Sequence, residues 1–197
     1  VAVYEGRGLR PRLEYAPSAA PGLALALLAA GFTIEATFPL LTCEPGQNHS
    51  VAADGVSVSD AVDERDHQDA MSVAAAAYGG APERPVPASW LGARMAMVAS
   101  GGGVAVARDR ETGEAVGSGL YQVPVEGVTE LAAVGTLPTQ RQGGVATAVI
   151  SHLVGRALRQ EVHLVWLTAE HDAERHPAEQ AGFRDTGEVM VHISRSS

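Results

Sequence analysis

Apolar and polar positions follow a helical period most clearly in the segment after Gly144. Its apolar residues recur at spacings of three and four, so they share one face of a helix: Ala146, Val149, Ile150, Leu153 and Ala157. Residues 162–168 form a nearly continuous apolar run rich in β-branched residues, which favours a buried strand of the parallel type. This stretch therefore predicts a helix followed by a buried strand.

The same periodicities predict the other elements of residues 55–193. A strand begins near Val56, and the helix after it starts at a cap formed by Ser59 or Asp60 and ends at 78–80. The elements around the periodic helix are, in order, a loop with Pro82, Pro85 and Pro87, a helix at 88–98, strands at 104–108, 115–123 and 129–137, the periodic helix, the strand at 162–168, a short helix from Asp172 to 181–183, and a strand at 188–193.

Residues 1–45 predict a shorter unit of strand, helix and strand. The helix spans 22–30 and stops at Gly31, a common C-terminal cap, between strands at 12–15 and 32–41. Residues 46–54 contain Gly, Asn and Ser and have the composition of a linker. The sequence Ala-Gly-Phe at 30–32 recurs 151 residues later at 181–183, which gives modest support for an internal duplication.

Composition narrows the class of protein. Apolar residues make up 46% and charged residues 19% of the chain, as in a soluble globular protein. The net charge is -9 and every basic residue is arginine, which argues against a general nucleic-acid binder. The single Cys43 excludes an intrachain disulfide, and the longest apolar run, Leu23 to Ala30, is too short to cross a membrane. We therefore expect a soluble, cytoplasmic protein.

The segment Thr136–Thr147 carries most of the candidate chemistry. Backbone N–H groups at a helix start are unpaired and partly positive, and small residues at Gly143, Gly144 and Ala146 allow a phosphate to approach them. The segment lacks the Lys-Ser/Thr of a P-loop and the glycine spacing of the dinucleotide fingerprint. The alternative is that the two glycines only allow a tight turn between strand and helix.

Residues 55–193 resemble the GNAT superfamily of N-acetyltransferases. The resemblance rests on the pyrophosphate motif Gln/Arg-x-x-Gly-x-Gly/Ala, which stands here as Arg141-Gln142-Gly143-Gly144-Val145-Ala146, and on the order of elements around it. It implies an α/β fold with a mixed, mostly antiparallel sheet flanked by helices. It also implies three segments: residues 1–45 as the C-terminal part of a second, partial GNAT-like unit of a tandem protein, 46–54 as a linker, and 55–197 as the acetyltransferase domain.

The resemblance further implies acetyl-CoA as the acyl donor and a small-molecule or peptide amine as the acceptor. Amides of the motif loop, from Arg141 and Gln142 through Gly143, Gly144, Val145 and Ala146 to Thr147, would hold the pyrophosphate. The end of the third strand, Val134-Gly135-Thr136, would pair with the pantetheine arm as an added strand. Family members carry a bulge in this strand, and Gly135 is either its site or a packing choice.

The same resemblance suggests how a proton leaves the amine. Glu130 stands eleven residues before Arg141, the spacing of a GNAT base glutamate, with its side chain on the strand face of Ala132 and Val134. The alternative is a solvated carboxylate that only attracts a cationic amine. The tyrosine that protonates the leaving thiolate in many members is replaced by Ala178, so Tyr121 or His176 would have to substitute, or no acid acts.

Other functional classes remain as alternatives. The five histidines of the second half, at 152, 163, 171, 176 and 192, lack the spacing of a metal site, so we expect no metal. Direct acetyl transfer to a primary amine is the favoured function. The missing tyrosine leaves a non-catalytic acyl-CoA-binding regulator as the alternative, and a third reading makes the N-terminal piece a docking module of a homodimer. We expect no nucleic-acid partner and no membrane association.

Overall fold

The computed structural model describes residues 4, 6–7, 9–80 and 86–195, so Pro82 and Pro85 of the predicted loop lie outside the described residues. The chain forms two compact units. Unit 1 contains Val1–Leu41, Thr168–His171 and Asp185–Ser197, and unit 2 contains Thr42–Leu167 and Asp172–Arg184. The last strand thus packs with the N-terminal residues.

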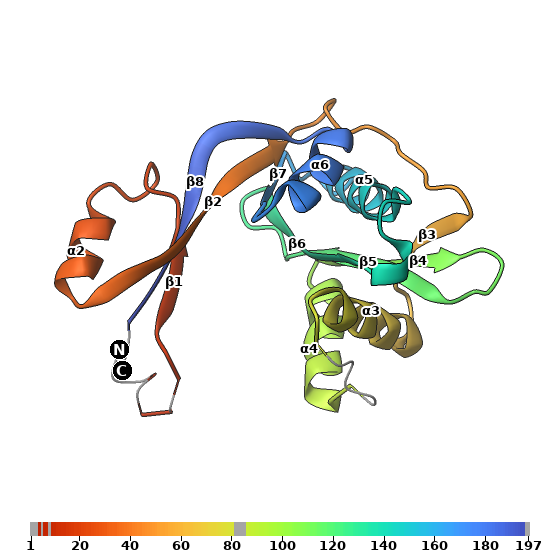
Figure 1. Ribbon diagram of the computed structural model, residues 1–197, viewed down its shortest axis with the longest axis horizontal. Coiled ribbons are helices and arrows are strands. Elements are labelled where there is room, and N and C mark those ends of the chain that lie inside the picture. Colours follow the sequence, from red (N-terminus) through yellow and green to blue (C-terminus); the bar gives the residue numbers. More distant parts are fainter. Residues whose placement is uncertain (1–3, 5, 8, 81–85, 196–197) are drawn as a thin grey trace. The chain divides into compact units, whose positions relative to one another are not determined.

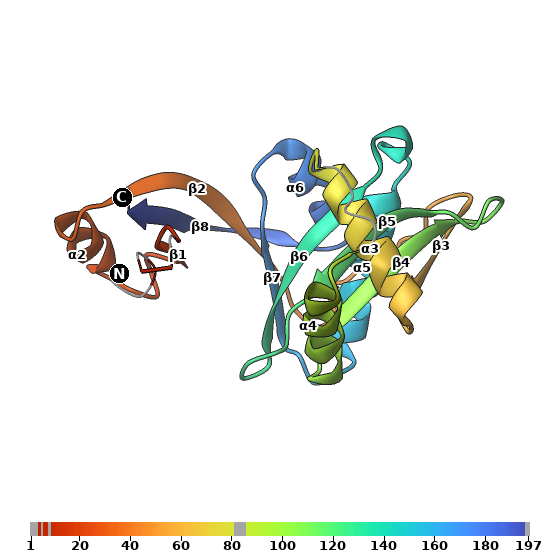
Figure 2. The ribbon, with the colours of Figure 1, turned by 90° about the horizontal axis from the view of Figure 1, so that it is seen from below.

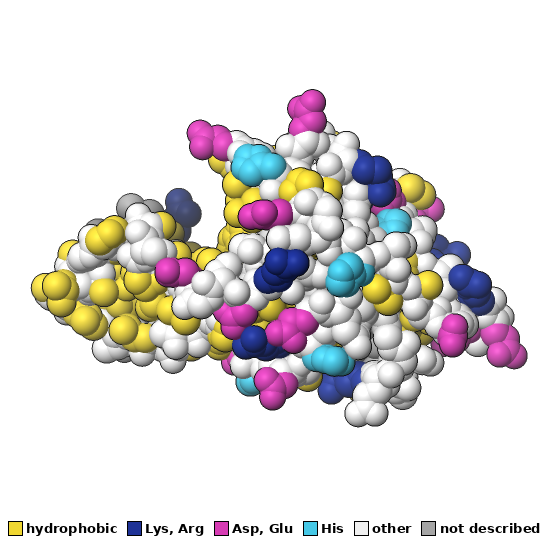
Figure 3. All heavy atoms as spheres, turned by 90° about the horizontal axis from the view of Figure 1, so that it is seen from above, with side chains coloured by type: hydrophobic (Ala, Val, Ile, Leu, Met, Phe, Trp, Pro, Cys, Tyr) yellow, Lys and Arg dark blue, Asp and Glu magenta, His cyan; other side chains and the backbone are white. Residues whose placement is uncertain are grey.

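Unit 1 is built on the strand order β1-β8-β2. Strand β1 (Arg12–Tyr15) runs antiparallel to β8 (Arg184–Arg195), and β2 (Phe32–Cys43) lies on the other side of β8. Helix α2 (Leu23–Ala29) packs Leu23 and Leu27 against Tyr15 and Phe32. No residue of α2 is buried, and hydrophobic side chains gather on the surface of this unit (Figure 3).

Unit 2 contains the strand order β7-β6-β5-β4-β3. Strands β3 (Val56–Asp60), β4 (Gly103–Asp109), β5 (Ala115–Tyr121) and β6 (Val128–Thr136) pair antiparallel, while β7 (Leu164–Thr168) pairs parallel with β6. The parallel strand is the one that its continuous apolar run predicted. The prediction of a mixed, mostly antiparallel sheet flanked by helices is therefore confirmed.

Helices cover both faces of the sheet of unit 2. Helices α3 (Glu64–Ala77) and α4 (Ala88–Ala99) lie on one face, and α5 (Val145–Leu158) and α6 (Asp172–Gln180) lie on the other (Figures 1 and 2). Helix α5 packs close to strand β5 because β5 has glycines at the contact. A Cβ on Gly117 would lie 2.5 Å from Val145 Cγ1, and one on Gly119 would lie 3.0 Å from Val149 Cγ1. On the opposite face, Ser118 Oγ donates to the Ala70 carbonyl of α3.

The cap of one helix differs from its prediction. The cap of α3 is Asp63, whose carboxylate accepts from the Asp66 N–H at 2.8 Å, because Ser59 and Asp60 belong to β3 and pair with β4. The predicted linker is held against the helices: the His49 N–H donates to Ala181 O, and Val51 N–H donates to Ser151 Oγ.

Among the described residues, no helix combines the length and apolar character that a membrane crossing requires.

Candidate active site

The loop between β6 and α5 exposes the first turn of a helix. After the 3-10 turn Pro138–Gln140, the backbone takes positive φ at Gln142 (68°) and at Gly144 (75°), and Gly144 is the N-cap of α5. Within the described chain no side chain caps this helix, and its first turn has no acidic residue. Its leading N–H groups therefore remain available to an anion, and the helix dipole favours negative charge there.

The space beside these N–H groups is open because the two residues that lead into the helix, 143 and 144, are glycines. A Cβ built on Gly144 would have Ala53 Cβ, 3.9 Å away, as its nearest neighbour, and one on Gly143 would be 3.5 Å from the Gln140 carbonyl. The side chains of Val145 and Thr147 point into the core and are 3% and 2% exposed. Residues 143–145 and Thr147 thus leave backbone N–H groups uncovered by their own side chains, which suits the pyrophosphate of a CoA-type ligand.

Arg141 connects this loop to the opposite layer of helices. Its Nη2 donates to the carbonyl of Ala77, the last residue of α3, at 3.0 Å. A cation at a helix C-terminus satisfies a carbonyl that lacks an intrahelical partner and is favoured by the helix dipole. The side chain therefore anchors the loop as well as placing positive charge beside it.

Strand β6 contains a bulge near its C-terminal end, two residues before Thr136. Leu120 pairs with Ala132 and Ser118 pairs with Gly135, so two residues, 133 and 134, face Gly119 alone. Ala133 has φ of 51°, as an extra residue in a bulged strand can. The sequence left Gly135 as either the site of this bulge or a packing choice, and the register places the bulge at residues 133 and 134 instead. Gly135 stays in register, and it lacks a side chain because a Cβ there would lie 2.8 Å from Ala77 Cβ.

The bulge reverses the direction of one side chain. Ala132 packs with Leu120 on the face of α3, whereas Val134 Cγ2 lies on the α5 face, 3.2 Å from a Cβ built on Gly119. Glu130 precedes Ala132 by two residues and shares its face. The predicted common face of Glu130, Ala132 and Val134 therefore holds for the first two and is wrong for Val134.

The edge of β6 away from β5 is open past Glu130. The parallel ladder with β7 runs from the pair Val128↔Leu164 to the pair Glu130↔Trp166 and ends there. Leu137 N–H donates across to Val116 O of β5, so by alternation Val134 and Thr136 direct their backbone groups to the opposite edge. Within the described residues, Thr136 Oγ1 is buried without a hydrogen-bond partner. An extended amide-containing group such as a pantetheine arm fits this edge.

Tyr78 was missed by sequence reasoning. It is the C-cap of α3, its side chain is 62% exposed, and its hydroxyl donates to the Val134 carbonyl at 3.1 Å. The hydroxyl therefore lies at the open edge of β6. No motif marked this tyrosine, because its position depends on how α3 packs against a strand 56 residues later.

The two predicted substitutes for the absent acid stand in different surroundings. Tyr121 is fully buried under α5, donates to Gln160 Oε1 at 2.8 Å, and has a pKa raised by burial, so it does not reach a substrate. His176 is exposed and lies 3.0 Å from Gln180 Nε2, while Gln180 Oε1 accepts from Thr147 Oγ1 in the first turn of α5. Ala178, at the usual tyrosine position, is fully buried.

A second group of ionisable residues lies between α3 and α4. His67 is 3% exposed, and Nδ1 has no hydrogen-bond partner among the described residues. Burial, followed by the positive charge of Arg94, lowers the pKa of His67, and burial lowers the pKa of Arg94 as well. His67 is therefore a neutral core residue at pH 7. Elsewhere in the described chain, no three His, Cys, Asp or Glu side chains are arranged to hold a metal.

Comparison with known proteins identifies the family. The pattern of the Acetyltransferase (GNAT) family matches residues 69–183, more than half of the chain, and this range includes Glu130 and the motif loop. No curated protein sequence matches significantly. A GCN5-related N-acetyltransferase from Kribbella flavida is similar over 100% of this chain and 72% of its own, with 25% identity and a TM-score of 0.79.

Two further structures share the fold at lower identity. A GCN5-related N-acetyltransferase from Sphaerobacter thermophilus covers 94% of this chain with 18% identity and a TM-score of 0.71, and this chain spans 60% of it. A tandem GNAT protein from the clavulanic acid biosynthesis pathway covers 98% with 12% identity and a TM-score of 0.67, and this chain spans 66% of it. The family pattern and the fold together identify this chain as a member of the GNAT acetyltransferase family, and hence as an acyltransferase.

Proposed function

We propose that this chain transfers an acetyl group from acetyl-CoA to a primary amine by direct attack of the amine. The observation that carries the proposal is the uncapped start of α5 beside the open edge of β6. Acetyl-CoA would supply the acetyl group as a thioester. Backbone N–H groups of residues 142–147 would bind the pyrophosphate, and the edge of Val134–Thr136 would bind the pantetheine arm and polarise the thioester carbonyl.

Glu130 is the proposed general base. An ammonium ion has no lone pair, so a carboxylate must first take its proton. Glu130 is partly buried on the α3 face of β6, at the last ladder pair before the strands separate. The net charge of -9 would also favour a cationic acceptor.

Tyr78 is the proposed proton donor to the leaving thiolate. Its hydroxyl lies on the open edge of β6, bound to the carbonyl of Val134, and it is exposed enough to exchange that partner for a substrate. Tyr121 is excluded by its burial. This assignment would compensate for the loss of the family tyrosine at Ala178.

The alternative function is a non-catalytic acyl-CoA-binding regulator, and Ala178 is the observation that favours it. Calorimetry with acetyl-CoA tests binding, and detection of released thiol with a panel of primary amines then separates enzyme from binder. Thiol release that depends on the amine supports acetyl transfer. Tight binding with no release for any amine would favour the regulator, and absence of binding would reject both.

We also propose the tandem organisation: 1–45 as the C-terminal part of a partial GNAT-like unit, 46–54 as the linker and 55–197 as the acetyltransferase domain. The strand–helix–strand order of the first segment and its Gly31-Phe32 sequence support this, since Gly182-Phe183 stands at the same point of the second segment. Of the two GNAT-like segments, only 55–197 contains the motif loop. Calorimetry should therefore give one acetyl-CoA per chain, and sedimentation would test for a homodimer.

A further inference from the structure

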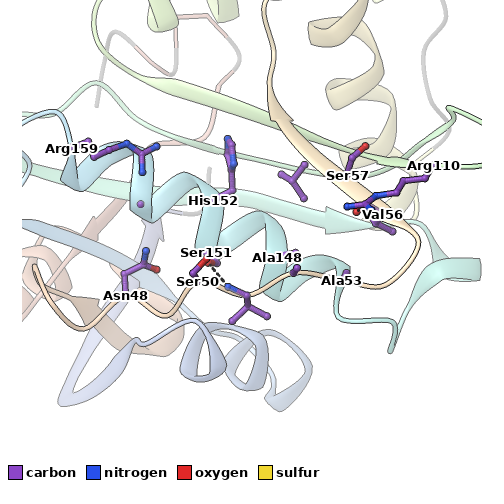
Figure 4. A pocket seen from close by; sticks show the side chains of 14 residues that line it. Asn48, Ser50, Ala53, Val56, Ser57, Arg110, Ala148, Ser151, His152 and Arg159 are labelled. Carbon is purple, nitrogen blue, oxygen red and sulfur yellow. Dashed lines mark hydrogen bonds between the residues drawn. The ribbon is translucent and has the colours of Figure 1, made fainter.

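Unit 2 contains a pocket on the side of α5 that faces β3 and the segment before it. The pocket has a volume of about 430 Å³, within the range of small-molecule sites. Its polar lining residues come from the 48–57 segment, the hairpin after β4, and α5: Asn48, Ser50, Ser57, Arg110, Ser151, His152 and Arg159 (Figure 4).

The wall formed by the segment before β3 is fixed in place. Ser151 Oγ donates to His49 O at 2.5 Å and accepts from the Val51 N–H at 3.0 Å, so one hydroxyl ties two residues of this wall to α5. Gly182 allows the same segment to lie against the end of α6, because a Cβ there would collide with the Gln47 carbonyl. The pocket is therefore a formed feature rather than a gap under a loose linker.

The charge of the lining is opposite to that of the protein. The chain has 23 acidic and 14 basic residues, yet no acidic side chain is present among the described residues that line the pocket. Asp60, which does not line the pocket, binds His152 Nε2 at 2.7 Å and Arg156 Nη1 at 3.1 Å, so the uncompensated charge of the lining is that of Arg110 and Arg159. The pocket therefore presents positive charge that its own lining does not neutralise.

The two lining arginines lie at opposite ends. Figure 4 shows Arg159 and Asn48 at one end, Arg110 and Ser57 at the other, and His152 between them, with both guanidinium groups directed toward the middle. Arg110 Nε donates to Val56 O at 3.0 Å, which orients the guanidinium and leaves its four terminal N–H donors for other partners. Apolar side chains also line the pocket, among them Val51, Ala53 and Ala148, and Figure 4 shows the last two between the arginines.

We propose that this pocket binds an elongated organic dianion, with a carboxylate or phosphate at each end and an uncharged middle. Each arginine would form charge-assisted hydrogen bonds with one terminal group. The apolar stretch and the volume exceed what an inorganic ion needs. No residue of β6 lines this pocket, but Ala53 of its lining is also the nearest neighbour of Gly144, so the pocket adjoins the proposed acetyl-CoA site without sharing the edge of β6.

Calorimetry on the full chain, without acetyl-CoA, tests the proposal. The probes are succinate, glutarate and adipate, a bisphosphonate of matched length, butyrate as the mono-acid, succinamide as the uncharged analogue, and inorganic phosphate. We expect one site per chain for at least one dianion, binding about 10-fold or more tighter than butyrate or phosphate. The preferred series identifies the terminal group. Equal binding of butyrate or phosphate, or no binding of any dianion, would overturn the proposal.

Variants locate the site. Arg110→Gln and Arg159→Gln should each weaken dianion binding about 10-fold or more, and Arg65→Gln, on exposed α3 surface, is the matched control. Arg159 is exposed and its side chain forms no hydrogen bond or ion pair within the described residues, so its variant should fold if Arg110→Gln does not. Unchanged binding in Arg159→Gln would contradict the proposal. Saturating CoA should leave dianion binding unchanged. Competition between CoA and the dianion would show that both bind at one site, which would contradict a second site. If the chain does not bind acetyl-CoA, the proposed function is rejected, but the measured binding of the dianion still stands.

Discussion

The hydroxyl of Tyr78 donates a 3.1 Å hydrogen bond to the carbonyl of Val134, joining the C-terminus of α3 to the bulged end of β6. This carbonyl belongs to the strand edge that β5 does not use. The bond therefore puts an exposed phenol where the proposed acyl group would lie, and it gives the missing family tyrosine a candidate replacement from another helix.

Removing this hydroxyl should slow turnover. Tyr78→Phe is expected to lower kcat by about 10²-fold, the lower end of general acid–base effects, because a thiolate is a tolerable leaving group. The KM for acetyl-CoA should change little. Steady-state kinetics checks this, with Tyr15→Phe in unit 1 as the matched control. An unchanged kcat would limit Tyr78 to holding the Val134 carbonyl.

The base assignment of Glu130 predicts a change in pH profile. Glu130→Gln should reduce kcat most at low pH, where the amine is protonated, and least at high pH, where it loses its proton without help. The rate should be measured across pH with Glu114→Gln, in the exposed hairpin, as the control. If KM for a cationic amine rises while the kcat profile keeps its shape, Glu130 only attracts the substrate.

The start of α5 should not tolerate a branched side chain. Gly144→Val places Val at φ of 75°, a backbone strain that destabilises the folded protein by about 1–3 kcal/mol. It also puts methyl groups beside the free N–H groups at the start of α5. Acetyl-CoA binding should fall by more than about 10-fold. Gly113→Val is a close control, because Gly113 has φ of 73° with open space around it, in the hairpin between β4 and β5 rather than in the motif loop. It should lose similar stability in thermal melts and keep its binding by calorimetry.

Arg141 should have a smaller effect on binding. Arg141→Ala removes the bond to the Ala77 carbonyl and a positive charge beside the cradle, so acetyl-CoA affinity should drop about 2- to 10-fold. Calorimetry beside Arg65→Ala checks the value. Should Arg141→Ala and Gly144→Val both bind as the unmodified protein does, the loop is not the acetyl-CoA site.

The buried His67 predicts a pH dependence of stability. Its pKa in the folded protein lies below the ordinary 6.5, first through burial and then through Arg94, although Asp63 and Asp66 oppose the shift. The unfolded chain therefore takes up the proton at higher pH than the folded protein, so the free energy of unfolding decreases as pH falls below about 6.5. His67→Leu should flatten urea midpoints between pH 8 and pH 5, and the exposed His171→Leu should not. Equal slopes in all three proteins would show that His67 has the same pKa in the folded and unfolded protein, which would contradict the prediction.

Local patterns carried much of the fold. The helical period of the apolar residues predicted α5, and the continuous apolar run predicted β7, the strand that pairs parallel with β6. Both predictions succeeded because each signal depends only on residues close in sequence. The glycine motif also marked the start of α5 correctly, since positive φ at Gly144 is a local property. Family membership followed from that motif and the order of elements.

The features decided only by tertiary structure are those that need a distant partner. The bulge at Ala133 turned Val134 to the α5 face, and it arises from the register between β5 and β6 rather than from any local signal. Tyr78 reached Val134, and Arg110 and Arg159 came to share one pocket, through the packing of elements far apart in sequence. Periodicity determines which residues form an element and which face is apolar, whereas strand register and helix docking determine which functional groups meet.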